Sequence, residues 1–427
     1  MDSLISNIYI VLYIIAWIVT IVLYQIKKKH IDAGSILLVL QLIYAITSLL
    51  LYNCNFYDFN SIKIFPFIYL FLMLMLSFWP VLKYNANKID EIQQISSVYL
   101  FTISIIFISA TVIQLPYVIT DFAESIKILI ARSSGGQELY NESLAKSSSI
   151  GDGSISNLPS IITNAFSKLG VLLFFYYLTF KKRNKLIIVG LFLSITLSLF
   201  DNISLGQRGP IIETFLSFII TYFALRKFLQ PKVNRIIKVI GISLLLTSII
   251  PITILTVSRF GGSTQGSMST VYYYGGQQNL YFNNFGLDNG GIRYGDRTFP
   301  FFKRMLGFKN VPHNFVERRQ KYPNLRINDE VFSSFVGDFT IDFGPVIASL
   351  IFIFFTTFVI IKIQIYNRII RFHQLILLHF VMNVCVQGGM KLFSFSDVGG
   401  NLQIIVYFAM YLFFRLDYNI RYLRLNK

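Results

Sequence analysis

The chain has 427 residues, of which 54% are hydrophobic and 14% are charged. Charged residues make up about a quarter of an ordinary globular domain, so this composition excludes a water-soluble protein of this size. The formal net charge is +17, but the Lys and Arg residues lie between apolar runs and form no basic globular domain, which excludes a nucleic-acid-binding protein. The two cysteines, Cys54 and Cys385, form neither a disulfide framework nor a CxxC metal pattern.

Eleven apolar runs have roughly the 20-residue length that a membrane helix needs. The first lacks a basic leader and a small-residue cleavage site, so we interpret it as a retained helix. The sequence predicts an all-α, polytopic integral membrane protein with about 11 transmembrane helices in a single membrane domain, residues 1–427. In chain order, the predicted spans are Leu4–Ile26, Ile31–Tyr52, Ile62–Leu82, Ile95–Ile119, Ile161–Phe180, Leu186–Leu205, Ile211–Phe228, Ile236–Val257, Pro345–Ile361, Phe372–Phe393 and Leu402–Leu416.

The distribution of Lys and Arg predicts how the chain crosses the membrane, because short cytoplasmic loops collect these residues. With the KKKH that follows the first run placed inside, 21 of the 38 Lys and Arg residues are cytoplasmic and three lie in short outer links. The sequence therefore predicts an N-terminus outside, a C-terminus inside, and two long extracytoplasmic loops over residues 120–160 and 259–344.

The second long loop is rich in Tyr and Phe, unlike a disordered segment. We therefore predict that it caps a chemical site at the membrane surface, although its tyrosines could also be interfacial anchors. The chain contains no P-loop, GxGxxG or HExxH motif. An enzyme on this outer face would use an already activated, lipid-linked substrate, and we predict neither a metal nor a cofactor.

Two arginines are candidates for binding the phosphates of such a substrate. Arg208 lies in LGQRGP between the sixth and seventh runs, and the planar guanidinium pairs with phosphate oxygens in two places. Pro210 can open the next helix and leave backbone N–H groups nearby. Arg259 ends the eighth run. The alternatives are a turn arginine at lipid headgroups for Arg208 and a snorkelling side chain for Arg259.

Further charged residues have both a chemical and a structural interpretation. Glu213, inside the seventh run, is either a proton acceptor or half of an ion pair, and Lys168 is a similar case. Asp338 and Asp342 are four residues apart, so on a helix they share one face; they suit general acid–base work or cap the ninth run.

The basic and imidazole side chains of the second loop complete the candidate site. His313 is the only histidine predicted outside, where it would deprotonate a sugar hydroxyl or be a plain surface residue. The remaining candidates for binding the pyrophosphate are Arg293, Arg297, Arg318 and Arg319. The alternative interpretation is that they are ordinary charges in contact with solvent.

Three stretches carry a family resemblance: SLGQRGPII around Arg208, YYYGGQQNLYFNNF followed by IRYGDRTF, and VFSSFVGDFTIDFGPV. With the many spans and the late outer loop, the chain resembles the O-antigen polymerase (Wzy) or oligosaccharide repeat-unit polymerase family of bacterial inner membranes, and more broadly the GT-C-type lipid-linked glycosyltransferases.

The resemblance implies a metal-independent glycosyltransferase of polysaccharide (lipopolysaccharide) biosynthesis that polymerises undecaprenyl-pyrophosphate-linked oligosaccharides at the periplasmic face of the inner membrane. Its partners would be this lipid-linked substrate, membrane lipids and a chain-length regulator protein. The alternatives are an O-antigen ligase, a flippase or transporter of lipid-linked oligosaccharides, and a non-enzymatic partner in a polysaccharide export complex. A transporter is expected to show internal repeats and polar residues near the bilayer midplane, and the sequence shows no repeat.

Overall fold

The computed structural model describes residues 2–54, 57–132, 134–149, 158–260, 266–327, 331–365, 367–388 and 393–425. These residues are mostly helical, and each predicted apolar run lies largely within a helix. Within the described residues, eight helices are long and apolar enough to cross a membrane. The prediction of an all-α, multi-pass membrane protein is thereby confirmed, while the count of eleven spans stays a prediction.

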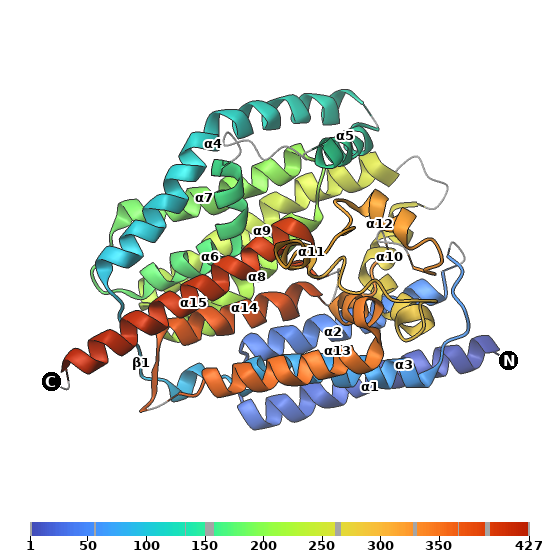
Figure 1. Cartoon of the computed structure of the whole chain (residues 1–427), viewed down its shortest axis with the longest axis horizontal. Coiled ribbons are helices and arrows are strands. Elements are labelled where there is room, and N and C mark those ends of the chain that lie inside the picture. Colours follow the sequence, from blue (N-terminus) through green and yellow to red (C-terminus); the bar gives the residue numbers. More distant parts are fainter. Residues whose placement is uncertain are drawn as a thin grey trace. The chain divides into compact units, whose positions relative to one another are not determined.

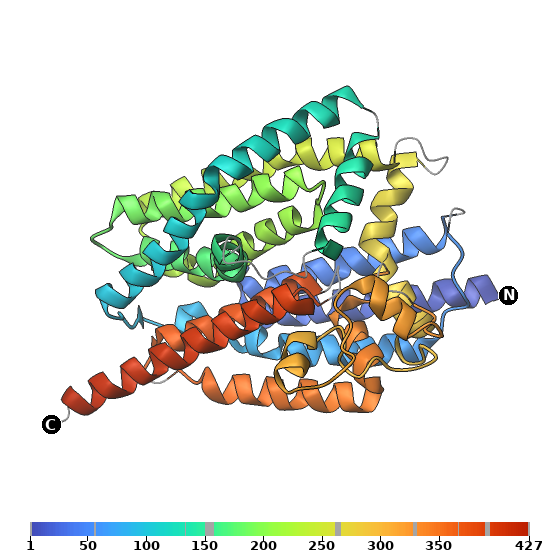
Figure 2. The same cartoon turned by 45° about the horizontal axis from the view of Figure 1, so that its top comes forward.

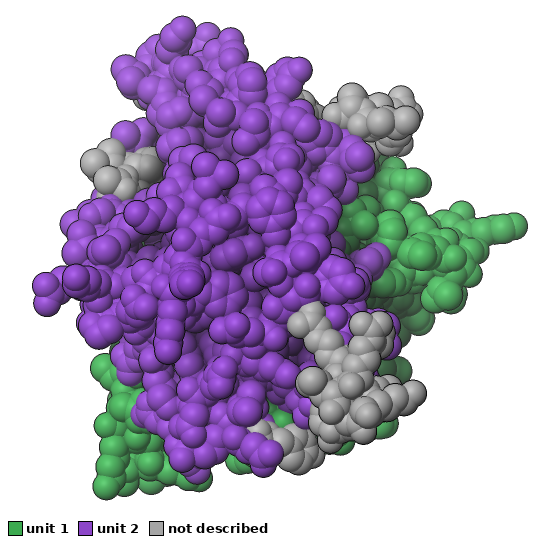
Figure 3. Space-filling view, turned by 90° about the vertical axis from the view of Figure 1, so that its left-hand side faces the viewer, with its two compact units in different colours: residues 1–85, 265–364, 380–404 green, residues 86–264, 365–379, 405–427 purple. Residues whose placement is uncertain are grey.

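The chain divides into two compact units, which Figure 3 shows in different colours. Unit 1 comprises residues 1–85, 265–364 and 380–404, and unit 2 comprises residues 86–264, 365–379 and 405–427. Two helices contribute to both units: α14 (Phe372–Gly388) and α15 (Asp397–Leu425).

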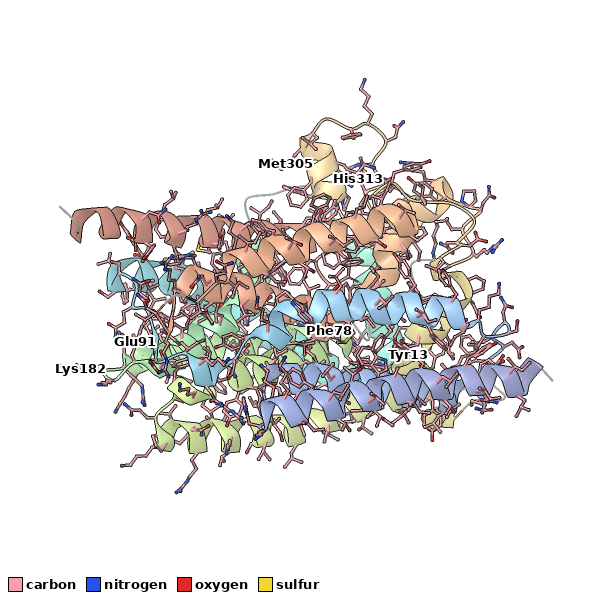
Figure 4. All side chains as sticks on the ribbon, turned by 90° about the horizontal axis from the view of Figure 1, so that it is seen from below. Tyr13, Phe78, Glu91, Lys182, Met305 and His313 are labelled. Carbon is pink, nitrogen blue, oxygen red and sulfur yellow. The ribbon has the colours of Figure 1, made fainter. Side chains whose placement is uncertain are left out.

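Long apolar helices make up most of unit 1, where α1, α2, α3 and α13 run along one another (Figure 1). Aromatic rings fill the space between α1 and α3: Tyr13 stacks on Phe67 at 4.6 Å between ring centroids, and Trp17 packs near Phe78. Figure 4 labels Tyr13 on α1 and Phe78 on α3. Residues on the opposite side of α1, such as Ile8 and Val19, are exposed, as expected of a surface that faces lipid. The elements of unit 1 are α1 (Asp2–Lys28), α2 (Ala33–Tyr52), α3 (Ile64–Lys83), α10 (Gly266–Tyr281), the π-helix η4 (Phe282–Gly286), α11 (Pro300–Met305), α12 (Phe315–Lys321) and α13 (Ser334–Lys362).

Local sequence explains where several of these helices begin and how closely they pack. Asp32 caps α2 and forms a reciprocal capping box with Ser35, and Asn314 caps α12 through the N–H of Glu317. Helix α10 lies directly against α2, because Gly276 has no side chain: a Cβ there would lie 2.6 Å from the Thr47 carbonyl oxygen.

Unit 2 is built mainly around α4, which packs along α6 and α7 (Figure 2). Gly170 and Gly190 permit this packing, since an added Cβ would lie 2.5 Å from Phe107 and 2.7 Å from Ile108. The strands β1 and β2, of two residues each, pair in parallel. Glu91, the first residue of β1, lies at the same end of the unit as Lys182 (Figure 4). The elements of unit 2 are the 3₁₀ turns η1 (Ala86–Lys88) and η3 (Arg226–Phe228), the strands β1 (Glu91–Ile92) and β2 (Ile369–Ile370), and the helices α4 (Ser97–Ala131), α5 (Gly135–Ser149), α6 (Leu158–Thr179), α7 (Lys185–Ser204), α8 (Gly209–Leu225) and α9 (Pro231–Phe260).

Both predicted outer loops contain more helix than their composition indicates. Helix α4 continues to Ala131 and α5 follows it, so residues 120–160 are largely helical where the structure describes them. The loop over residues 259–344 contains α10, α11, α12 and the first turns of α13. Helix α13 starts eleven residues before the predicted start at Pro345, and it is interrupted at Gly344, where φ is +78°. Residues 389–392 of the tenth predicted run lie outside the described residues.

Candidate functional site

Buried arginines and aspartates join three segments of unit 1. The arginine–aspartate cluster consists of Arg293, Arg297, Arg318, Asp338, Asp342 and Asp397. The arginines come from the connection between η4 and α13, and Asp338 and Asp342 come from the first turns of α13. All three arginine side chains and both α13 carboxylates are at most 6% exposed. Burying so many charges is tolerable only because each has an oppositely charged neighbour.

Asp342 is held on both carboxylate oxygens. Arg293 Nε lies 2.5 Å from Oδ1, while the backbone N–H and the hydroxyl of Thr298 donate to Oδ2 at 2.8 and 2.7 Å. The backbone N–H of Arg293 also donates to the Ile341 carbonyl at 3.1 Å. Asp342 therefore fastens the loop that carries Arg293 and Thr298 to α13.

Asp338 lies one turn earlier on the same helix face, so the predicted helical spacing of the two aspartates is confirmed. Its Oδ1 lies 3.6 Å from Arg293 and 3.6 Å from Arg297, and its Oδ2 accepts from the backbone N–H of Phe393. The rings of Phe299, Phe339 and Phe393 pack on one another beside these carboxylates. The surroundings of both ion pairs are therefore largely apolar, which strengthens their attraction.

Arg318 has a different kind of neighbour. Its Nη1 lies 2.8 Å from Oδ1 of Asp397, a carboxylate that is 52% exposed, whereas the Arg318 side chain is 4% exposed. Asp397 precedes the regular turns of α15 with a φ of +55°, and its N–H donates to the Arg297 carbonyl at 2.9 Å. The start of α15 is thus tied to the cluster through both backbone and side chain.

A pocket of about 220 Å³ lies beside the cluster. Three arginines contribute to its wall, and the phenol ring of Tyr322 lies among them. Arginine guanidinium groups bind phosphate and carboxylate oxygens in two places at once, so this wall is suited to an anionic ligand. The lining residues are Arg293, Arg318, Arg319, Tyr322, Pro323, Leu325 and Ile327.

Asp296 connects the pocket wall to α11 and α12. Its fully buried carboxylate accepts from Lys303, from Lys321 at 2.6 Å and from the hydroxyl of Tyr322 at 2.8 Å. Burial by itself would raise the pKa of Asp296, but the hydrogen bonds from these three side chains outweigh burial and lower it. Asp296 is therefore a permanent anion at neutral pH that fixes the position of Tyr322.

The local charge balance is positive. Around the pocket and cluster lie four arginines and two lysines, against four carboxylates from Asp296, Asp338, Asp342 and Asp397. An anion that enters the pocket would bring this balance closer to neutrality, whereas a cation would increase the excess.

The structure places the loop candidates in two different surroundings. Arg293, Arg297, Arg318, Asp338 and Asp342 come together in the cluster, and Arg319 lines the pocket. His313 is exposed and is not among the pocket-lining residues; it belongs to the connection between α11, which ends at Met305, and α12 (Figure 4). Its backbone N–H donates to Glu317 at 2.7 Å.

The remaining candidates belong to unit 2. Arg208 precedes α8, with Pro210 in the first turn as predicted, and its side chain is buried. Glu213 of α8 pairs with Lys168 of α6 at 3.3 Å, and both side chains are largely buried. Arg259 lies in the last turn of α9, and its side chain is outside the described part of the chain. The joint role of Arg208 and Arg259 stays a prediction.

Sequence reasoning missed Asp296, Thr298, Tyr322 and Asn401. Asn401 donates to the carbonyls of Thr298 and Phe395, both at 2.8 Å, and so connects α15 to the loop. The one available signal was the density of charge in the stretch from Arg293 to Arg297, where Asp296 stands between two arginines. Residues that meet only after the chain folds back leave no periodic pattern in the sequence.

Comparisons with protein-family models, with curated proteins and with solved structures gave no match to this chain.

Proposed function

We propose that the chain is a membrane-bound glycosyltransferase that polymerises oligosaccharide repeat units carried on undecaprenyl pyrophosphate, at the outer face of a bacterial inner membrane. The observation that carries the proposal is the arginine-lined pocket beside the buried arginine–aspartate cluster. The sequence resemblance described above supports the same reaction, and the Lys and Arg distribution supports an extracytoplasmic position for the loop.

In the proposed reaction, a hydroxyl oxygen of the acceptor sugar attacks the anomeric carbon of the donor. The bond from that carbon to the pyrophosphate oxygen breaks, and undecaprenyl pyrophosphate leaves with the bonding electrons. Arg318 and Arg319 of the pocket would stabilise the charge that develops on the leaving group, which is often the largest contribution to catalysis. Arg293, which also lines the pocket, would stabilise the same charge.

The acceptor proton needs a base, and the candidates differ in the contacts that their side chains already make. Asp342 accepts three hydrogen bonds and Asp338 faces two arginines, so both carboxylates already serve as counter-ions of buried arginines. His313 is exposed and outside the cluster. We therefore assign the aspartates to holding the arginines, and His313, which precedes the helix that carries Arg318 and Arg319, stays a candidate for the base.

A deletion of the gene in its native host tests the function. A polymerase mutant should still place single repeat units on the cell surface, because their export does not depend on polymerisation. Loss of the single units as well would contradict the proposal and would favour a flippase or a ligase.

The pocket is tested by Arg318→Ala and Arg319→Ala, each expected to lower polymer formation by about 100-fold or more at equal protein level. Arg326→Ala is the matched control, since Arg326 lies in the same loop but forms an exposed pair with Asp288. Long chains at normal yield in both pocket variants would rule out this pocket as the pyrophosphate site.

A further inference from the structure

Unit 2 contains a second pocket, formed by three helices of membrane-spanning length. Its volume is about 20 Å³, and one water-sized particle needs roughly 10–15 Å³ measured in this way. The pocket therefore has room for a single small particle and is too small for a sugar ring or a phosphate. The lining residues are Gln114 and Val118 of α4, Thr163 and Asn164 of α6, and Leu197, Ser198 and Asp201 of α7.

Oxygen atoms dominate the polar part of this lining. Five of the seven residues carry a side-chain oxygen, and Asp201 is the only one that carries a charge. The Thr163 hydroxyl lies 2.5 Å from Oε1 of Gln114 and also contacts the Pro159 carbonyl oxygen; because both of these oxygens can only accept, the hydroxyl donates its one proton between them, and its own lone pairs remain as acceptors. Carboxylate, amide and hydroxyl oxygens are the ligands that hard cations prefer.

The electrostatics of the pocket also favour a cation. Asp201 lies in the last turn of α7, at the negative end of that helix, and Asp121 of α4 interacts electrostatically with it. Among the residues that the structure describes, no Lys or Arg forms an ion pair with Asp201; the nearby lysine of α6, Lys168, pairs with Glu213. A carboxylate in a membrane-length helix that has no basic counter-charge calls for another source of positive charge.

We propose that this pocket binds one monovalent cation of about the size of Na⁺, with the Asp201 carboxylate as its charged ligand and the Gln114, Thr163 and Ser198 side-chain oxygens as neutral ligands. A single carboxylate balances one positive charge, whereas divalent sites for Ca²⁺ normally take six to eight oxygen ligands with several carboxylates. The proposal does not depend on the enzymatic activity, because it concerns a separate set of residues within unit 2.

The experiment measures the melting temperature (Tm) of the purified full-length protein in detergent, in NaCl and in choline chloride at equal concentration. Equal ionic strength cancels general screening, so only specific binding of the small cation raises the Tm. Saturating Na⁺ should raise the wild-type Tm by roughly 2 °C or more over choline. The Asp201→Asn variant should lose this difference, whatever its own baseline stability.

Two further variants make the outcome specific. Glu124→Gln removes an exposed carboxylate from α4, three residues after Asp121, and should keep the full Na⁺ effect. Thr163→Val removes one neutral ligand and should raise the Na⁺ concentration for half of the effect by roughly 10-fold. If Asp201→Asn does not fold, Thr163→Val carries the test alone. Equal Tm values in NaCl and choline chloride, or an undiminished Na⁺ effect in the Asp201 or Thr163 variant, would overturn the proposal.

Discussion

Asp338 and Asp342 lie one helical turn apart on α13 but contact the arginines in different ways. Asp342 contacts Arg293 directly and also holds the loop backbone through Thr298, whereas Asp338 lies between Arg293 and Arg297. The four-residue spacing in the sequence predicted that the two carboxylates share a face, and it does not distinguish these roles. The difference arises from which loop residue each carboxylate meets.

Removing Asp342 should therefore strongly destabilise the protein. Asp342→Ala leaves the buried Arg293 without its closest counter-ion, and we expect the free energy of unfolding to fall by about 3–5 kcal/mol. Equilibrium unfolding of the purified protein in detergent measures this change. Asp288→Ala is the control, because it removes an ion pair whose side chains are 53% and 75% exposed and should cost at most about 1 kcal/mol. Similar losses in the two variants would mean that burial does not govern the Asp342 contact.

The lowered pKa of Asp296 predicts how the stability of the protein changes at acidic pH. Its pKa is lower in the folded protein than the value of about 3.9 for an unfolded chain. A carboxyl group with a lowered pKa stabilises the fold fully above its unfolded pKa, and this contribution is lost as the pH falls through the folded value. We expect the wild-type protein to lose stability more steeply than Asp296→Asn below about pH 4. Parallel curves of Tm against pH would show that the Asp296 contacts do not stabilise the loop.

At the scale of elements, Gly344 and Pro345 divide α13 into a short buried piece and a long apolar one. Gly344 has a φ of +78°, a conformation that residues with a side chain rarely adopt. The break sets the direction of the turns that carry Asp338 and Asp342 independently of the apolar helix that follows. The sequence marks the position with Gly-Pro but indicates a helix start there, not a break within a longer helix.

Two glycine variants should therefore change stability in opposite directions. Gly344→Ala has room for the added methyl group, since the nearest atom to its Cβ position lies 3.9 Å away on Ile292, but the backbone strain should cost about 1–3 kcal/mol. Gly399→Ala lies on an exposed turn of α15 with no atom within 4 Å of the new Cβ and should stabilise the helix by about 0.5–1 kcal/mol. Thermal unfolding of both variants tests this, and a stabilised Gly344→Ala protein would contradict the strain.

The helices that could be predicted from the sequence are those that contain an apolar run long enough to cross a membrane. Where the structure describes them, the eleven apolar runs are largely helical, because a membrane-length apolar segment must satisfy its own backbone hydrogen bonds. Helices α5 and α10 were not predicted, since their stretches GGQELYNESLAKSSS and GSMSTVYYYGGQQNLY are polar or rich in Gly. Helix α10 is held by a tertiary contact that no local pattern reveals, the close approach of Gly276 to Thr47 on α2.

At the scale of the whole molecule, the distribution of Lys and Arg predicts the topology. A C-terminal fusion to green fluorescent protein should fluoresce, because the C-terminus is predicted inside, and an alkaline phosphatase fusion after Lys309 should be active outside. An inactive phosphatase at this position would contradict the predicted orientation and, with it, an extracytoplasmic pocket. A phosphatase fusion after Lys182 is the control and should be inactive.

The order of the charges along the chain has a consequence for biosynthesis. A nascent polypeptide leaves the ribosome N-terminus first, so Arg293 and Arg297 are already made when the aspartates of α13 enter the translocon. The counter-ions thus precede the carboxylates that need them, which reduces the cost of carrying two acids at the head of an apolar helix. The Phe393 N–H that Asp338 accepts from is made 55 residues after Asp338, and Asp397, the partner of Arg318, is made 79 residues after Arg318. The ribosome therefore has to synthesise α14 before the last contact of the cluster can form.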